Sequence, residues 1–413
     1  MKYKEGFSSA LVRKLIETTS GEQILDPFSG AGTTALTAMG MGLQGTGIEI
    51  LPLGNLVAQS VAHSANGLSP KEFHAASQAL LRATSRQNCD RQYALKHIPI
   101  TEKAFPRRTD REIANARSFI EKLDNPALAT VLNLACLSVL EEVSYTRKDG
   151  QFLRWDPRSG RNVSAKLNKG NIPSFSAALA FRLQQIERDF PLLKEQYAGP
   201  TPTFITGSSL TELKKLPKNK FDCVVTSPPY ANRYDYTRTY ALELVYLDYD
   251  NSQIKALRQT LLSATVENRS KRELLFAIYQ GATDIRRVFN AVDEHAALQE
   301  ILSILREHAA ELSNRNIIHL LENYFTEMAL ITYELGRVVK PGGSVFMVND
   351  NVQYHGEEVP VDLILSDFAE QFGFRCNAIW MLARGKGNSS QQMGKFGRRE
   401  IRKCLYHWVR SDD

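Results

Sequence analysis

The sequence predicts an α/β fold in which a mostly parallel sheet carries helices on both faces and is interrupted by two mainly helical insertions. A short apolar strand at 23–25, a glycine-rich turn, a helix-forming stretch and a second strand at 45–50 form a strand–helix–strand unit. Strand-like segments resume only at 203–206 and 221–225, after a long helical stretch. A second helical stretch then precedes the C-terminal strands. We therefore expect one α/β domain built from 1–60, 200–250 and 320–413, with insertions at 61–199 and 251–319.

Composition and charge set the broad class of the protein. The 413 residues are 43% hydrophobic and 23% charged, as in ordinary globular proteins, and the net charge is +6. The five cysteines, at 89, 136, 223, 376 and 404, form no Cys-x-x-Cys pair, so neither a metal site nor a disulfide framework is expected. No apolar signal segment follows the N-terminus, and the apolar run 127–140 is short and broken by polar residues. We read that run as a buried helix and expect a cytoplasmic protein without a membrane span.

The first elements follow from local patterns. Residues 11–19 carry apolar side chains at helical spacing and end before a Ser-Gly pair. A helix over 33–39 begins directly after the glycine turn and is closed by Gly40 and Gly42. These elements complete the first strand–helix–strand unit.

The later elements repeat the alternation of helix and strand. The pattern predicts a helix at 321–338, a turn at 340–343, a strand at 344–348, a helix at 361–372, and strands at 374–383 and 403–410. A basic, glycine-rich loop joins the last two strands.

The glycine-rich turn indicates a nucleoside-containing cofactor. It lies where the first strand meets the first helix, and glycines there allow a ligand to approach the backbone closely. The Lys-Ser/Thr pair of a phosphate-binding P-loop is absent. Glu49, 19 positions after Gly30, ends the second strand, where a carboxylate can accept hydrogen bonds from ribose hydroxyls. The candidate cofactor residues are Asp26, Pro27, Phe28, Gly30, Gly32, Thr33, Thr34 and Glu49.

A second motif follows the strand at 221–225. Ser227-Pro228-Pro229-Tyr230 sits at the carboxyl end of this strand, where open α/β sheets bind ligands. The two prolines remove N–H donors, so their carbonyls and the Ser227 hydroxyl can act as acceptors for an exocyclic amino group. Tyr230 offers a flat face on which a base can stack. These four residues are the candidate catalytic residues.

Together the two motifs resemble those of the S-adenosylmethionine-dependent DNA amino-methyltransferases, which implies a Rossmann-like methyltransferase sheet. That family's first motif reads Asp-Pro-Phe-x-Gly-x-Gly-Thr-Thr, which residues 26–34 match. Its catalytic motif reads Asp/Ser/Asn-Pro-Pro-Tyr/Phe, and the Ser-Pro-Pro-Tyr form is typical of N4-cytosine enzymes. The family's N-terminal Phe, which lines the methionine end of the cofactor, corresponds to Phe7. The resemblance covers about 1–60, 200–250 and 320–410.

The resemblance implies that a methyl group passes from S-adenosylmethionine directly to the N4 amino group of a cytosine flipped out of DNA. Acceptors at Ser227 and Pro228 would align the amino nitrogen, which is catalysis by positioning and electrostatics. Carbon-5 methylation of cytosine needs a cysteine nucleophile, typically after a proline, and none of the five cysteines follows one.

Two basic stretches are candidates for contact with double-stranded DNA. Residues 144–170 hold seven Lys/Arg and two Asp, and residues 384–403 hold seven Lys/Arg and one Glu. Such stretches suit phosphate contacts, and amide side chains can address base edges. The candidate DNA-binding residues are Arg147, Lys148, Arg154, Trp155 and Arg158 in the first stretch and Lys386, Asn388, Gln391, Lys395 and Arg398 in the second.

Recognition of a target site needs a region beyond the cofactor fold, and the insertion 61–199 is the better candidate because the chain ends soon after the last strand. The role of 251–319 stays open between helical elaboration, subunit contact and a substrate role. N6-adenine methylation is the main alternative reaction, RNA guanine-N2 methylation a second, and a silent DNA-binding subunit the non-enzyme alternative. A restriction endonuclease is a possible partner, whereas the oligomeric state is left open.

Overall fold

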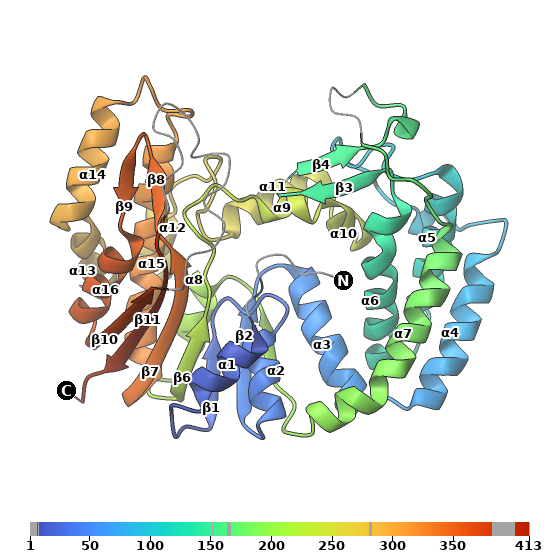
Figure 1. Ribbon diagram of the computed structural model, residues 1–413, viewed down its shortest axis with the longest axis horizontal. Coiled ribbons are helices and arrows are strands. Elements are labelled where there is room, and N and C mark those ends of the chain that lie inside the picture. The colour runs from blue at the N-terminus through green and yellow to red at the C-terminus, as the bar shows by residue number, and fades with distance from the viewer. Residues whose placement is uncertain are drawn as a thin grey trace.

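The predicted α/β fold is confirmed by a seven-stranded, mostly parallel sheet (Figure 1). The computed structural model describes residues 6, 8–150, 152–162, 167–280, 283–381 and 401–412. The strand order is β10–β11–β7–β6–β1–β2–β5. The strands are β1 (Gln23–Asp26), β2 (Gln44–Glu49), β5 (Thr203–Thr206), β6 (Phe221–Thr226), β7 (Val339–Asp350), β10 (Phe374–Met381) and β11 (Lys403–Arg410).

Only β11 breaks the parallel arrangement, since it pairs antiparallel with both β7 and β10. The neighbouring strands β5, β2, β1, β6 and β7 are parallel, so their carboxyl ends meet at one edge of the sheet. The first and second motifs follow β1 and β6, which are adjacent.

Alternating apolar side chains bury the two faces of the sheet separately. One face packs on α1 (Ser9–Ile16) and α2 (Thr33–Gly40) through Ile24, Cys223 and Phe346. The other packs on α15 (Ile317–Val338) and α16 (Val361–Gln371) through Leu25, Val224 and Val345. Helices therefore cover both faces, as the sequence predicts.

The helical regions lie on opposite sides of the sheet in Figure 1. On one side are α3 (Pro52–Asn66), α4 (Pro70–Thr84), α5 (Arg107–Ile120), α6 (Pro126–Val143) and α7 (Phe175–Gln196), with the short helices η1 (Arg91–Tyr93) and η2 (Pro157–Ser159). On the other side are α12 (Arg272–Ile278), α13 (Thr283–Asp293) and α14 (Ala296–Glu307). The remaining elements are α8 (Ser209–Glu212), η3 (Leu213–Lys215), α9 (Tyr236–Thr239), α10 (Ala241–Tyr246), α11 (Asn251–Thr260), β8 (Val352–Tyr354) and β9 (Glu357–Val359).

Helix α6 contains the apolar run at 127–140. It is the one helix among the described residues that is long and apolar enough to cross a membrane by length and composition, and half of its 18 residues are buried within the fold. Its buried side chains, including Leu132, Cys136 and Leu140, pack into a core shared with α5 and α7. The expected buried helix is therefore confirmed.

Three local features differ from the expectation or add to it. Residues 340–343, expected as a turn before a strand, form an irregularity within β7, where Gly342 has φ 73° and the register with β6 shifts. Strands β3 (Thr146–Asp149) and β4 (Phe152–Trp155) pair antiparallel as a hairpin, although the surrounding pattern is helical. Helices α10 and α11 bury Leu244 and Leu257 in the core of the first helical region, away from the core of the sheet.

Candidate active site

A cavity of about 260 Å³ opens where β1, β2 and β6 end. From the first motif, Pro27, Phe28, Gly30 and Thr33 line it, and Glu49 closes one side. Ser227 and Pro229 of the second motif line the same cavity. The structure thus brings together residues about 200 positions apart because β1 and β6 are neighbours in the sheet.

Asp26 supports the first motif from below the cavity. Its Oδ1 atom accepts hydrogen bonds from the backbone N–H of Phe28 at 3.0 Å and from the Thr226 hydroxyl at 2.7 Å. The carboxyl group is fully buried, and that burial raises its pKa to about 6. Thr34 acts similarly, since its hydroxyl donates to the Val225 carbonyl at 2.9 Å. Both side chains join the first motif to β6 and do not line the cavity.

Glu49 places a carboxylate at the cavity wall. Its Oε2 accepts the N–H of Gly30 and its Oε1 accepts the N–H of Leu51, both at 2.7 Å. Burial raises its pKa to about 7, and the nearby Asp26 charge contributes in the same direction. The two N–H groups fix the orientation of the carboxylate, which retains acceptor sites for a ligand.

Glycines occur in this region because the backbone has positive φ angles or passes close to a neighbouring segment. Gly30 and Gly32 have φ values of 52° and 84°. A Cβ atom on Gly32 would stand 2.6 Å from that of Ala58. Gly54, which the sequence reasoning did not single out, allows α3 to pass the first motif, since a Cβ there would lie 2.4 Å from the Gly30 carbonyl oxygen.

The second motif forms a loop with its own internal contact. Ser227 is partly exposed to the cavity, and its hydroxyl lies 3.2 Å from the hydroxyl of Tyr230. Pro228 is buried, and neither it nor Tyr230 lines the cavity. Tyr354 of β8 donates a hydrogen bond to the Ala231 carbonyl, which fixes the chain directly after the motif. Phe7, the remaining candidate cofactor residue, lies outside the described residues.

Further side chains line the cavity that no sequence motif marked. Tyr236 follows the second motif, and Leu261 and Leu262 come from the end of α11, inside the second insertion. Ser208 and Ser209 also line it, and the Ser209 hydroxyl donates to the Pro27 carbonyl. Tyr236, Leu261 and Leu262 reach the cavity only through tertiary packing. For the two serines, the one sequence signal is their location directly after β5.

Comparison with known proteins decides the family. No family model matches the chain. The type II methyltransferase M.BsoBI of Geobacillus stearothermophilus is 39% identical over 450 residues, which cover 99% of this chain and 84% of the relative. The type II methyltransferase M.AvaI of Anabaena variabilis is 41% identical over 421 residues, which cover 98% and 85%. The chain belongs to the type II methyltransferases. A more distant relative, M.MvaI of Kocuria varians, is 22% identical over 88% of this chain.

Membership of this family makes the chain a DNA methyltransferase. The motif resemblance and the fold thus agree with the comparisons at the level of the family.

In this methyltransferase three of the predicted DNA-binding residues reach solvent, Arg147 and Arg154 from the hairpin β3–β4 and Arg158 from η2 directly after it. Arg147 is exposed, and Arg154 is exposed while its Nε lies 2.5 Å from Asp149. Arg158, half-exposed, makes a bidentate pair with Asp156, with both N–O distances 2.8 Å. A phosphate would compete with these carboxylates for the two arginines.

Lys148 and Trp155 are placed differently from what DNA contact requires. The Lys148 side chain is 6% exposed, pairs with the buried Glu243 and lies over the ring of Tyr240 at 4.7 Å. Trp155 is 7% exposed, and the guanidinium of Arg161 covers its ring at 4.2 Å. Their burial against the protein removes both side chains from the solvent-facing side of the hairpin. The second basic stretch, with Lys386, Asn388, Gln391, Lys395 and Arg398, lies outside the described residues.

A group of metal-ligating side chains lies apart from this cavity. His308, Glu311 and His355 bring their ligand atoms within 4.8 Å of one another. The two imidazole rings stack with centroids 4.6 Å apart, and His308 shares a hydrogen bond of 3.2 Å with Glu311. These contacts account for the grouping without an ion.

Proposed function

We propose that this methyltransferase transfers a methyl group from S-adenosylmethionine to the exocyclic N4 atom of cytosine at a specific site in DNA. The observation that carries the proposal is the shared cavity: the first motif and Glu49 line one part, and Ser227 and Pro229 line another. In this proposal the methyl donor would lie next to the amino group that accepts the methyl.

The residues of the cavity suit the proposed donor. Glu49 presents a carboxylate to the cavity, which suits ribose hydroxyl donors, and Gly30 leaves the backbone open to close approach. Apolar side chains of Phe28, Leu51 and Leu210 supply surface for an adenine ring. S-adenosylmethionine supplies an activated methyl group, so neither a metal ion nor a covalent enzyme intermediate is needed.

The second motif would hold the amino group of the base. The Ser227 hydroxyl and the Pro228 carbonyl would accept its two N–H donors, which favours a pyramidal nitrogen with an available lone pair. Tyr230, whose hydroxyl lies near Ser227, would stack on the base. We assign cytosine because the leading residue of the motif is serine, as in enzymes of the N4-cytosine type.

The DNA contacts complete the proposal. The exposed arginines of the β3–β4 hairpin and of η2 would contact phosphates: Arg147, Arg154 and Arg158. The insertion 61–199 would select the target site, and a cognate restriction endonuclease of a restriction-modification system would share that site. Exchange of 61–199 with the corresponding segment of a relative would then move the methylated sequence.

Mass spectrometry of nucleosides from treated DNA tests the reaction. With S-adenosylmethionine present, N4-methylcytosine should accumulate, and Ser227→Ala should slow turnover while leaving donor affinity intact. Ser138→Ala, which removes a serine of α6 remote from the motif, is the matched control and should be as active as the parent. Exclusive formation of N6-methyladenine would refute the base assignment, and full activity of Ser227→Ala with Tyr230→Ala would refute the mechanism.

A further inference from the structure

The second insertion reaches the cavity at the end of α11. Leu261 and Leu262 line the cavity there, and the chain continues through 263–271 before α12 begins. Tyr236 lines the cavity at the start of α9, a helix that contacts α11. We propose that Glu267 is a positioning residue that holds these two walls of the donor site together, an inference that rests on the proposed function.

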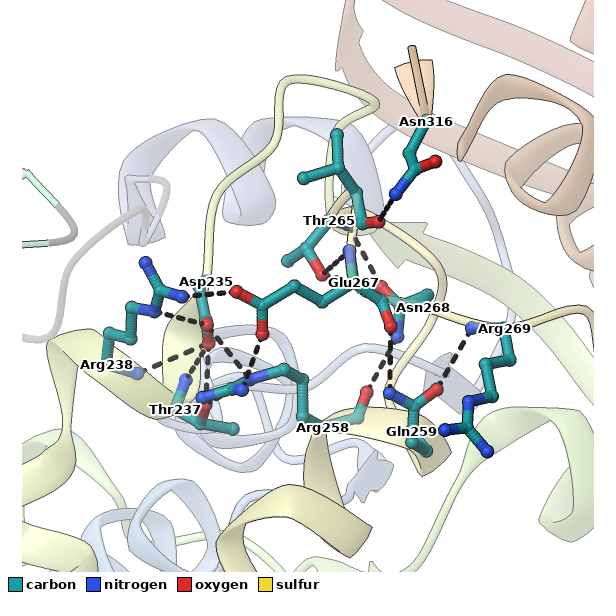
Figure 2. Close-up of polar contacts among 11 residues, drawn as sticks. Asp235, Thr237, Arg238, Arg258, Gln259, Thr265, Glu267, Asn268, Arg269 and Asn316 are labelled. Carbon is teal, nitrogen blue, oxygen red and sulfur yellow. Dashed lines mark hydrogen bonds and ion pairs between the residues drawn. The ribbon is translucent and has the colours of Figure 1, made fainter. Parts of the chain in front are cut away.

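Glu267 connects the two walls through a pair of arginines (Figure 2). One carboxylate oxygen pairs with Arg258 Nη1 at 2.6 Å, and the other pairs with Arg238 Nη2. The Nε atoms of both arginines also face Asp235 Oδ2, at 3.0 Å for Arg258 and 3.1 Å for Arg238. Two carboxylates and two guanidinium groups thus form a charge-balanced cluster.

Asp235 ties the cluster to the wall that follows the second motif. Its Oδ1 atom accepts hydrogen bonds from the backbone N–H groups of Thr237 at 2.9 Å and Arg238 at 3.2 Å, so it caps α9. Asp235 is 3% exposed and directly precedes the cavity-lining Tyr236. A displacement of the cluster is therefore transmitted to Tyr236 by a single peptide unit.

Polar contacts make the segment around Glu267 a defined structure. The amide of Asn268 accepts from the Thr265 N–H at 3.0 Å and donates to the Arg258 carbonyl at 2.8 Å. Gln259 donates to the Glu267 carbonyl at 2.9 Å (Figure 2). Because the segment is fixed to α11 in this way, the position of Glu267 and that of Leu261 are linked.

A second anchor of the same segment has a different character. Lys271 and Ser263 both contact Glu327 of α15, and all three side chains are buried. Loss of that buried anchor would unfold the segment. The Glu267 side chain is 41% exposed, so its substitution leaves the core intact. The substitution therefore tests how the cavity-lining residues are positioned and not whether the segment folds.

The experiment compares Glu267→Gln with Asp293→Asn. Asp293 pairs with Arg272 through a contact of 2.5 Å, is 53% exposed and lies in the same insertion away from the donor cavity. Calorimetric titration with S-adenosylmethionine should show a dissociation constant raised roughly tenfold in Glu267→Gln, the order expected from loss of a charge-assisted hydrogen bond. Asp293→Asn should bind like the parent, and Glu267→Asp should recover part of the affinity.

The outcomes separate this inference from the proposed function. Equal donor affinity in the parent and in Glu267→Gln would overturn the positioning role and leave the proposed function standing. A parent protein that binds no donor would overturn the proposed function, and the positioning role with it. If the melting temperature of Glu267→Gln falls far below that of Asp293→Asn, the donor titration is repeated with Arg238→Gln. Donor affinity equal to that of the parent in Arg238→Gln would then overturn the inference.

Discussion

Removal of the Lys148 ammonium by Lys148→Met should destabilise the protein without weakening its contact with DNA. The ammonium lies between Glu243, whose side chain is 2% exposed, and the ring of Tyr240. Burial already raises the pKa of Glu243, and Lys148 opposes that shift. The variant therefore leaves a buried carboxyl group that must either stay charged without its cation or take up a proton.

The expected size of the effect follows from this burial. Removal of one partner from a buried ion pair costs about 3–5 kcal/mol, whereas replacement of both partners by apolar side chains is often close to neutral. Lys148→Met should therefore lower the free energy of unfolding by about 3 kcal/mol near pH 7, and Lys148→Met with Glu243→Leu should regain most of that loss. The penalty should shrink as pH falls, because protonation of Glu243 removes the isolated charge.

Urea unfolding and DNA titration at several salt concentrations measure the two effects. Arg147→Met, which removes an exposed cation from the adjacent position in β3, is the matched control. It should change stability by less than about 0.5 kcal/mol and reduce the salt dependence of DNA binding. The reasoning fails if Lys148→Met unfolds like the parent while its DNA affinity drops as in Arg147→Met.

Four other predictions concern the donor site, its packing and the DNA surface. The affinity for S-adenosylmethionine should rise with pH through about 7 as Glu49 ionises. Calorimetric titration of Glu49→Gln with this donor should show weak binding that does not depend on pH. The same raised pKa means that Glu49 in the ligand-free protein should lower stability by up to about 3 kcal/mol between pH 4.5 and 7, because the unfolded chain ionises first; urea unfolding of Glu49→Gln should lose this contribution and keep that of Asp26, whose pKa is about 6. Gly54→Ala should cost about 1–3 kcal/mol in urea unfolding, because its Cβ would crowd the Gly30 carbonyl. Arg154→Gln should reduce the salt slope of DNA binding by about one, and an unchanged slope would assign Arg154 to ordinary surface.

The part of the fold that the sequence predicts best is the part fixed by local pattern. The first strand–helix–strand unit was predicted to within a residue or two, because β1, the glycine turn and α2 each have short-range signals. The two motifs line one cavity, since the carboxyl ends of adjacent parallel strands share an edge. The local sequence signals and the position of each motif at the end of a strand were enough for these inferences.

The parts that sequence reasoning could not supply depend on distant partners. A basic residue in a polar stretch indicates exposed surface, yet Lys148 pairs with Glu243, 95 positions away. The same holds for Trp155, a candidate DNA-binding residue whose ring is covered by the guanidinium of Arg161. Leu261 and Tyr236 carry no motif, and only the packing of α11 and α9 brings them to the cavity.

The segment 235–243, which follows the second motif, receives an anchor from each helical region. Lys148 of the β3–β4 hairpin pairs with Glu243 at one end of it, and the arginine pair held by Glu267 binds Asp235 at the other. Both anchors are ion pairs whose members are held by further contacts, so each has one favourable geometry. The ends of the short helices that carry Tyr236 to the cavity are thus held from both sides of the sequence. Side chains from both helical regions therefore fix this one short segment, because Lys148 holds Glu243 and the arginine pair holds Asp235.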